Sequence, residues 1–202
     1  MKKLILVGGI LALSMSVAAQ SATLTFDDIP GGSVQNAFGD MPTYKGFNFS
    51  FTLDWIDLEA SSWNYGAHSG DFGILNNNHG TGIVTEASGA DFTFDGLWAK
   101  NWATSPDSGG ADTSFGNLQG YNNGSLVWSV ATSLNGSYEN YGAQAGAIDE
   151  LRLGFGGVFL VDDLSLNGVS VSAVPIPAAA FLFAPALLGF MGLRRKAKNS
   201  VA

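Results

Sequence analysis

The sequence predicts an all-β protein, a single jelly-roll-like antiparallel β-sandwich, and three observations support this class. Runs of alternating apolar and polar residues recur along the chain, as half-buried strands require. Glycine-containing turns such as IPGG, SPDSGG, YNNG and LNGS separate these runs. No comparably long helical period appears before residue 175. About eight or nine short strands with one apolar face each must close on one another, which gives a sandwich or a barrel.

The clearest strand is GFNFSFTLD at residues 46–54, which alternates strictly. The run ADFTFDGLWAKNW at residues 90–102 repeats the pattern. The apolar positions that these two runs place on a buried face are Phe47, Phe49, Phe51 and Leu53, then Phe92, Phe94 and Trp98. Three further runs rich in β-branched and aromatic residues follow at 124–132, 149–155 and 157–171.

Charge is distributed unevenly along the chain. The stretch from Asp27 to Asp163 contains all seventeen acidic residues and three of the nine basic ones, a net charge of −14. Such an acidic body repels nucleic acid and anionic lipid, and favours cations or neutral partners. The absence of cysteine excludes disulfides and thiolate sites.

The N-terminus has the three-part pattern of a secretory signal peptide over residues 1–22. Lys2 and Lys3 precede an uncharged run, and small residues follow it. Val17 and Ala19 suit cleavage after Ala19, and cleavage after Ala22 is the alternative, so the cleavage point falls near 19–22. The predicted ectodomain spans residues 23–173, outside the cytoplasm.

The irregular region from residue 55 to 85 is the candidate ligand-binding loop. Its aromatic and polar side chains could stack on sugar rings and hydrogen-bond to them. The candidate residues are Trp55, Trp63, Tyr65, Asn78 and His79. The alternative is a surface loop whose aromatic residues cover the edge of the sandwich.

Two aspartate pairs suggest a structural Ca²⁺ ion. Alternation places Asp28 on the face of Leu24 and Phe26, and Asp162 on the face shared by Leu160, Leu164 and Leu166. A buried carboxylate needs a cation, a hydrogen-bond network or a proton, and oxygen ligands suit calcium. We therefore expect Asp28 and Asp162 to hold calcium, with Asp27 and Asp163 as further possible ligands. The alternative is that each aspartate caps a strand or turn in solvent.

Catalytic motifs are absent from the sequence, which predicts that the protein is not an enzyme. The chain has no H-E-x-x-H, G-x-S-x-G or phosphate-binding glycine loop. Its two histidines, His68 and His79, are eleven residues apart in a loop and are expected at the surface rather than at a metal.

The C-terminal segment 174–198 combines an apolar run with a basic end. Residues 176–193 contain no charge, and as a helix they would extend about 27 Å, close to the thickness of a bilayer core. Basic residues at 194–198 follow at once, and should stay cytoplasmic by the positive-inside rule. The sequence therefore predicts one C-terminal transmembrane helix with the body outside.

This segment resembles the PEP-CTERM sorting signal of Gram-negative bacteria. The matching residues are Val174, Pro175 and Pro177 at the entry, and Arg194, Arg195 and Lys196 at the basic end. Ile176 stands where the name-giving motif has glutamate, so the chain resembles a Val-Pro-x-Pro-Ala-Ala variant. The resemblance implies processing by an exosortase-type enzyme at the inner membrane, then placement at the cell surface or outside, in association with exopolysaccharide or biofilm.

The body is also similar to ectodomains of that family that begin TLTFDD and end FLVDDLSLNG. These are related in appearance to galactose-binding and carbohydrate-binding-module sandwiches. The resulting hypothesis is an exported, non-catalytic surface protein that binds carbohydrate. The alternatives are a structural acidic matrix component without a ligand pocket, and a glycan-acting hydrolase.

Overall fold

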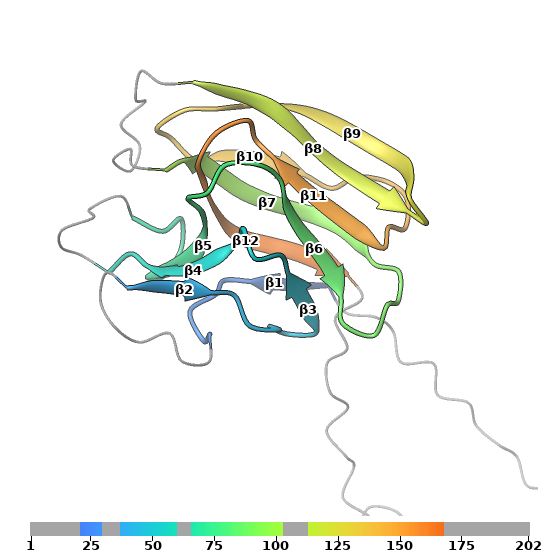
Figure 1. Cartoon of the computed structure of the whole chain (residues 1–202), viewed down its shortest axis with the longest axis horizontal. Helices are drawn as coiled ribbons and strands as arrows, with labels where there is room; N and C mark the ends of the chain where they lie inside the picture. The colour runs from blue at the N-terminus through green and yellow to red at the C-terminus, as the bar shows by residue number, and fades with distance from the viewer. Residues whose placement is uncertain (1–20, 30–36, 60–65, 103–112, 168–202) are drawn as a thin grey trace, which may run out of the picture. The chain divides into compact units, whose positions relative to one another are not determined.

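The computed structural model describes residues 21–29, 37–59, 66–102 and 113–167, and these ranges form strands, turns and loops without a helix (Figure 1). They contain twelve strands in two antiparallel sheets, one of seven strands and one of five. The predicted all-β class and antiparallel sandwich are confirmed. The sequence suggested only about eight or nine strands, because strands of three or four residues are too short to show a period of two.

The seven-stranded sheet contains both ends of the described chain. Its order is β10-β7-β12-β5-β4-β2, and β1 pairs separately with β12. The strands are β1 (Ser21–Leu24), β2 (Phe38–Asp40), β4 (Asp54–Asp57), β5 (Phe72–Asn76), β7 (Thr93–Asn101), β10 (Glu139–Gly142) and β12 (Phe159–Asn167). Ser21 of β1 lies opposite Asn167 of β12, so the described chain begins and ends on neighbouring strands.

The five-stranded sheet has the order β3-β6-β11-β8-β9. Its strands are β3 (Phe47–Phe49), β6 (Gly82–Glu86), β8 (Ser114–Asn122), β9 (Ser125–Leu134) and β11 (Glu150–Gly154). Asn123 and Gly124 join β8 to β9, both with positive φ, at 50° and 73°. A two-residue Asn-Gly loop with two positive φ angles matches the twist of the strands, which explains the length of this hairpin.

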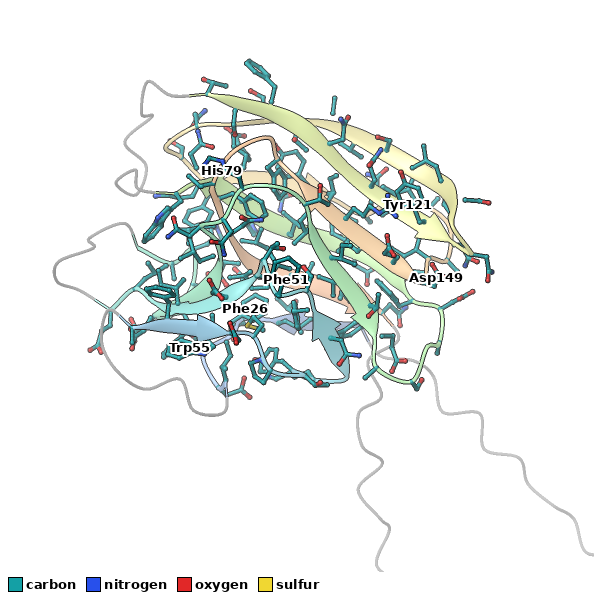
Figure 2. The ribbon with its side chains drawn as sticks, in the orientation of Figure 1. Phe26, Phe51, Trp55, His79, Tyr121 and Asp149 are labelled. Atoms are coloured by element: carbon teal, nitrogen blue, oxygen red, sulfur yellow. The ribbon has the colours of Figure 1, made fainter. Side chains whose placement is uncertain are left out.

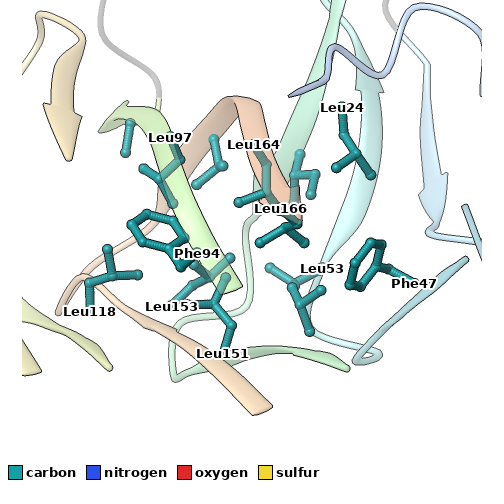
Figure 3. Close-up of a cluster of buried hydrophobic side chains, with 14 of the residues drawn as sticks. Leu24, Phe47, Leu53, Phe94, Leu97, Leu118, Leu151, Leu153, Leu164 and Leu166 are labelled. Atoms are coloured by element: carbon teal, nitrogen blue, oxygen red, sulfur yellow. The ribbon is translucent and has the colours of Figure 1, made fainter. Parts of the chain in front are cut away.

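The main hydrophobic core lies between the sheets, and both sheets contribute to it (Figure 3). Its buried leucines and phenylalanines include Leu24, Phe94, Leu97, Leu164 and Leu166 from the seven-stranded sheet, and Phe47, Leu118, Leu151 and Leu153 from the five-stranded sheet. Each such side chain contributes about 1.5–3 kcal/mol when it leaves water. The core therefore fixes which side of every strand faces inward.

The predicted strand at residues 46–54 is in fact two strands in different sheets. β3 ends at Phe49 and β4 begins at Asp54, and Phe51 in the intervening turn is 86% exposed. The Leu53 N–H donates to the Ser50 carbonyl and closes this turn. The buried positions expected for Phe47 and Leu53 are confirmed, but that for Phe51 is wrong because the chain changes sheet here.

The expected alternation at residues 90–102 also fails at one point. Phe92 and Phe94 are buried in the core as predicted, but Leu97 and Ala99 take the next core positions. Trp98 between them therefore lies on the outer side of the sheet. The pairing of β7 with β12 shifts register beside Gly96, and this irregularity exchanges the two sides of the strand.

The predicted sorting signal at 174–198 lies outside the described residues, as does the signal peptide apart from its last two positions. Within the described ranges, no helix is long and apolar enough to cross a membrane. The domain boundaries, the transmembrane helix at 176–193 and the export signal stay predictions from the sequence.

Candidate functional site

Trp55, the first aromatic residue of the predicted binding loop, is a packing residue on β4. Its ring lies 6.3 Å from the Phe72 ring, and it packs against the main core. Trp55 pairs with Ile74, which is fully buried in that core, so both side chains face inward. Trp63 and Tyr65 lie outside the described residues.

The polar residues predicted for the same site lie in the turn between β5 and β6. The Asn78 N–H donates to the Asn76 side-chain oxygen at 3.2 Å, and His79 has a φ of 58°. Both Asn78 and His79 are exposed. Figure 2 shows His79 and Trp55 in separate parts of the molecule. The described members of the predicted loop site therefore do not converge on one ligand.

Asp28, predicted to point inward, has an exposed side chain with a relative accessibility of 65%. β1 ends at Leu24, and Phe26 has a φ of 65°, so the alternation from Leu24 stops before Asp28. The carboxylate accepts a hydrogen bond from the Tyr44 hydroxyl and pairs with Lys45 Nζ at 3.0 Å. The Tyr44 bond and then the Lys45 bond lower the pKa of Asp28. The predicted inward orientation of Asp28 is wrong, because the chain leaves the regular strand before Asp28 and its side chain is exposed.

Asp162 is fully buried, as predicted, but on the outer side of the seven-stranded sheet. Leu164 and Leu166 lie in the main core, whereas Leu160 lies in a separate cluster with the outer side chains. The register shift after Asp162, where Asp163 has a φ of 48°, exchanges the two sides. Burial raises the pKa of Asp162 to about 7, despite bonds that favour the carboxylate.

The segment 68–72 lies beside Asp162 and bonds to the carboxylates of Asp162 and Asp163. The Ser69 N–H donates to one carboxylate oxygen at 2.8 Å, and the Asp163 N–H donates to the other at 2.6 Å. The Ser69 hydroxyl donates to Asp163 at 2.7 Å, and His68 Nδ1 lies 2.7 Å from the other Asp163 oxygen. The His68 ring stacks on Trp98 at 4.1 Å. Both carboxylates of the β12 pair therefore anchor this segment.

Asp27, which follows β1 near the start of the described chain, also bonds to segment 68–72. Its carboxylate accepts bonds from the N–H groups of Asp71 at 2.9 Å and Phe72 at 3.3 Å. Gly70 has a φ of 55°, and a Cβ atom there would lie 2.1 Å from the Asp27 oxygen. A glycine is thus required for Asp27 to reach the backbone. The two aspartate motifs share a structural task in holding residues 68–72.

Metal binding by these aspartates is not evident from their geometry. Among the residues described, no group of three or more His, Asp or Glu side chains is placed to hold a metal ion. Asp28 bonds to Tyr44 and Lys45 and shares neither partner with Asp162. Asp162 and Asp163 both accept hydrogen bonds from Ser69, one from its N–H and the other from its hydroxyl. Calcium binding stays a prediction.

The outer side of the seven-stranded sheet forms a second apolar cluster. Ile56, Leu58, Leu75 and Leu160 are each at most 4% exposed, and Ala67 and Trp102 pack against them. Together with Trp98, Asp162 and segment 68–72, this side of the sheet is largely occupied by the protein itself.

The outer side of the five-stranded sheet is polar, and we call it the polar face. Leu151 and Leu153 point into the core, so Glu150 and Arg152 point outward, and the strand register extends this assignment to the neighbouring strands. The outward positions are Asn48, Ile83, Thr85, Phe115, Asn117, Gln119, Tyr121, Leu126, Ser129, Ala131, Ser133, Glu150, Arg152 and Gly154. Amide and hydroxyl side chains are the largest group, and the exposed Phe115 and Leu126 add apolar surface.

Arg152 occupies the middle strand of the polar face and stacks on Tyr121. The guanidinium carbon lies 3.9 Å from the centre of the Tyr121 ring, and Nε donates to the Glu150 carboxylate. This bond raises the pKa of Arg152. The side chains of Arg152 and Glu150 are 37% and 27% exposed. Beside them, Gln119 Nε2 donates to the Ser129 hydroxyl at 3.4 Å. The polar face thus combines the stacked Arg152–Tyr121 pair with side chains that donate and accept hydrogen bonds.

Sequence reasoning missed the polar face because its residues come from distant strands. Tyr121, Arg152 and Asn48 lie on the same side of one sheet only because the strands are ordered β3-β6-β11-β8. A usable signal existed, since Arg152 alternates with Leu151 and Leu153 and must point away from the core. Its neighbours could not be derived without strand order.

No family model and no curated protein matches this chain. Among solved structures, the chain is similar to a DUF4465 family protein from Bacteroides caccae ATCC 43185, with a TM-score of 0.44 and 12% identity over 73% of this chain and 98% of that one. It is also similar to the C-terminal family 22 carbohydrate binding module of Clostridium thermocellum Xyn10B, with a TM-score of 0.37 and 13% identity over 75% and 95%. At these values the similarity transfers no ligand to this chain.

Proposed function

We propose that this protein is an exported, non-catalytic surface protein that binds polysaccharide through its polar face. The observation that carries this proposal is the Arg152–Tyr121 stack at the centre of a surface of amide and hydroxyl side chains. Sugar rings offer apolar faces to planar groups, and their hydroxyls both donate and accept hydrogen bonds. Side chains on rigid strands hold such groups in place without an ordering cost on binding.

The export part of the proposal rests on the two ends of the sequence. A signal peptide at 1–22 sends the body across the inner membrane, and the PEP-CTERM-like segment 174–198 holds it there until an exosortase-type enzyme acts. Intact mass and fractionation of the native protein test this step. A mature form without residues after about 174 supports sorting, whereas a full-length form in the inner membrane contradicts it.

The absence of catalysis is proposed from the carboxylates of the polar face. Glycoside hydrolysis needs two carboxyl groups that flank the bond to be broken. Among the described outward strand positions of this sheet, Glu150 is the one carboxylate, and it is bonded to Arg152. A jelly-roll-like sandwich of the galactose-binding or carbohydrate-binding-module type is the finer fold that we propose with this function.

Polysaccharide binding is tested with protein purified from cells that express the full chain, on a glycan array followed by calorimetry. Tyr121→Ala should weaken binding at least about tenfold, which corresponds to roughly 1.4 kcal/mol, because it removes the stacked ring and leaves Arg152 without its support. His79→Ala is the matched control from the loop favoured by the sequence, and should leave affinity unchanged. Loss of binding in His79→Ala but not in Tyr121→Ala would move the site to the loop. Absence of any glycan ligand would refute the proposal.

We propose calcium-dependent stability as a second, structural role, because Asp162 and Asp163 are adjacent carboxylates, one fully buried and the other 18% exposed. If Asp162 and Asp163 hold Ca²⁺, chelation with EGTA should lower the melting temperature, since a ligand that binds only the folded state stabilises it by about 2.7 kcal/mol at a hundred times its Kd. Asp162→Asn should abolish the calcium response. Asp28→Asn, at a surface position paired with Lys45, should retain it. An unchanged melting temperature in EGTA would count against calcium.

A further inference from the structure

The polar face is electrically neutral although the protein is strongly acidic. Among its outward strand positions only Glu150 and Arg152 are charged, and they are bonded to each other. The region from Asp27 to Asp163 nevertheless has a net charge of −14. The other acidic residues are therefore placed on other parts of the molecule, and the strand positions opposite Tyr121 hold Glu150 and the exposed Leu126.

Arg152 is poorly placed to receive an anionic ligand. A guanidinium binds a carboxylate or sulfate best through two parallel N–H bonds from a free planar edge. Here Nε is already bonded to the Glu150 carboxylate and one face of the group covers the Tyr121 ring. A carboxylated sugar would have to displace Glu150, or bring a second carboxylate beside it, and like charges in contact repel.

The surroundings of the polar face also disfavour a polyanion. Charges interact over a screening length of about 8 Å at physiological salt, so acidic groups at the margin of the face act on a chain lying across it. Asp149 is one such group, and Figure 2 shows it near Tyr121. Its carboxylate accepts the Asn123 N–H at 2.8 Å, in the turn that ends β8. No basic residue other than Arg152 stands on the described strand positions of the face to offset this field.

A neutral ligand meets none of these costs. Gln119, Asn117 and Asn48 carry amide groups, whose N–H donors and carbonyl acceptors suit the hydroxyls of a sugar. Gln119 already donates one N–H to Ser129, and the Asn48 carbonyl already accepts the Thr43 hydroxyl, so part of this capacity is used within the protein. With Glu150 in place, Arg152 serves as a flat, charge-compensated group for stacking and for hydrogen bonds to hydroxyl oxygens.

We propose that the polar face selects uncharged polysaccharides and rejects those that bear carboxylate or sulfate groups, with Glu150 as the residue that sets this preference. This inference rests on the proposed function, because it specifies the ligand class of the same site. Its consequence is that the protein recognises neutral polymers even in a matrix rich in acidic ones.

The test compares each neutral polymer with its own charged derivative, using glucan, mannan, galactan and xylan beside their carboxymethylated forms. The wild-type protein should bind at least one neutral polymer about tenfold or more tightly than the matched derivative. Glu150→Gln should lower this ratio of affinities or bring it below one, because the substitution removes the charged partner of Arg152 and lets Arg152 bind the carboxylate of the derivative. Asp149→Asn removes one negative charge without touching Arg152, and should change the ratio much less.

The outcomes separate the inference from the proposed function. If neither member of any pair binds, the proposed function fails. If the charged derivative binds as well as or better than its neutral parent, polysaccharide binding stands and the preference for neutral polymers is overturned. If Glu150→Gln and Asp149→Asn change the ratio equally, general charge rather than the Glu150–Arg152 pair sets it, and the role of Glu150 is refuted. Thermal melting of each variant shows whether it is folded.

Discussion

The two outer sides of this sandwich differ in what covers them. On the seven-stranded sheet, the apolar cluster around Leu75 and Leu160 is fully buried, and segment 68–72 is fastened there by aspartates from both ends of the sequence. On the five-stranded sheet, most outward side chains are polar, although Ile83 and Phe115 are apolar, and Arg152 and Glu150 remain partly exposed at their centre. One side is a second core and the other is an open surface.

This difference shows how one fold separates stability from recognition. An apolar outer side must be covered, because exposed apolar area favours association. Its cover in turn needs hydrogen-bond partners for its backbone, which Asp27 and Asp162 supply, while Asp163 bonds to the Ser69 hydroxyl. A polar outer side needs no cover, so its side chains are free to contact a ligand.

The largest expected effect of a single substitution comes from the covered side. Leu160→Ala should lower the free energy of unfolding by about 2–5 kcal/mol, because Leu160 is fully buried and its loss leaves a cavity. Chemical denaturation measures this change. The matched substitution on the polar face is Ile83→Ala, on a partly exposed residue, which should cost less than half as much. If both substitutions lowered the free energy of unfolding equally, the outer side of the seven-stranded sheet would not be a second core distinct from the polar face.

The pH dependence of stability should also distinguish the two sides. Burial raises the pKa of Asp162 to about 7 in the folded protein, above the ordinary value of 3.8. A carboxyl group with a raised folded pKa favours folding while it is protonated, and this contribution is lost as the pH rises from about 4 to about 7. In calcium-free buffer, stability should therefore fall over this range, by on the order of a few kcal/mol at most.

Asp162→Asn provides the reference for that measurement, since the amide cannot ionise. The melting temperature of the variant should vary less between pH 5 and pH 8 than that of the wild type. The melting temperature of the wild type should fall, relative to that of the variant, as the pH rises. If the wild type gained stability relative to Asp162→Asn as the pH rose, Asp162 would be stabilised in its charged form and the direction of the shift would be wrong.

The smallest effect on stability is expected at Phe115, on the polar face. Its side chain is 73% exposed, so Phe115→Ser should change the free energy of unfolding by no more than about 0.5 kcal/mol. An exposed aromatic ring is nevertheless a stacking group for a sugar, so the same variant should bind polysaccharide less tightly. Loss of stability with unchanged binding would remove Phe115 from the proposed site.

The fold class followed from the sequence because alternation is a local property of each strand. Phe47, Phe92 and Phe94 are buried as their spacing predicts. The errors occur where the chain departs from regular strand, at the turn that exposes Phe51 and at the register shifts beside Gly96 and Asp162. Each such irregularity exchanges the two sides, so a correct period still assigns the wrong face beyond it.

The residues predicted to form a binding loop do not lie together in the structure, and the reason is related to the errors in the fold. Trp55, Asn78 and His79 belong to one irregular stretch of the sequence, which predicts a common site. The structure places Trp55 against the core and the other two residues in a separate turn. Proximity along an antiparallel chain does not imply proximity in space, because successive residues point to opposite sides and successive strands can enter different sheets.

The sequence by itself determined that the chain is all-β, acidic in its body and marked at both ends by segments that resemble export and sorting signals. These features are local or compositional, so no fold is needed to recognise them. Only the tertiary structure decided that Tyr121, Glu150 and Arg152 share one surface and that the aspartates hold segment 68–72. Such groupings depend on strand order and bulges, which arise from packing both sheets around one core.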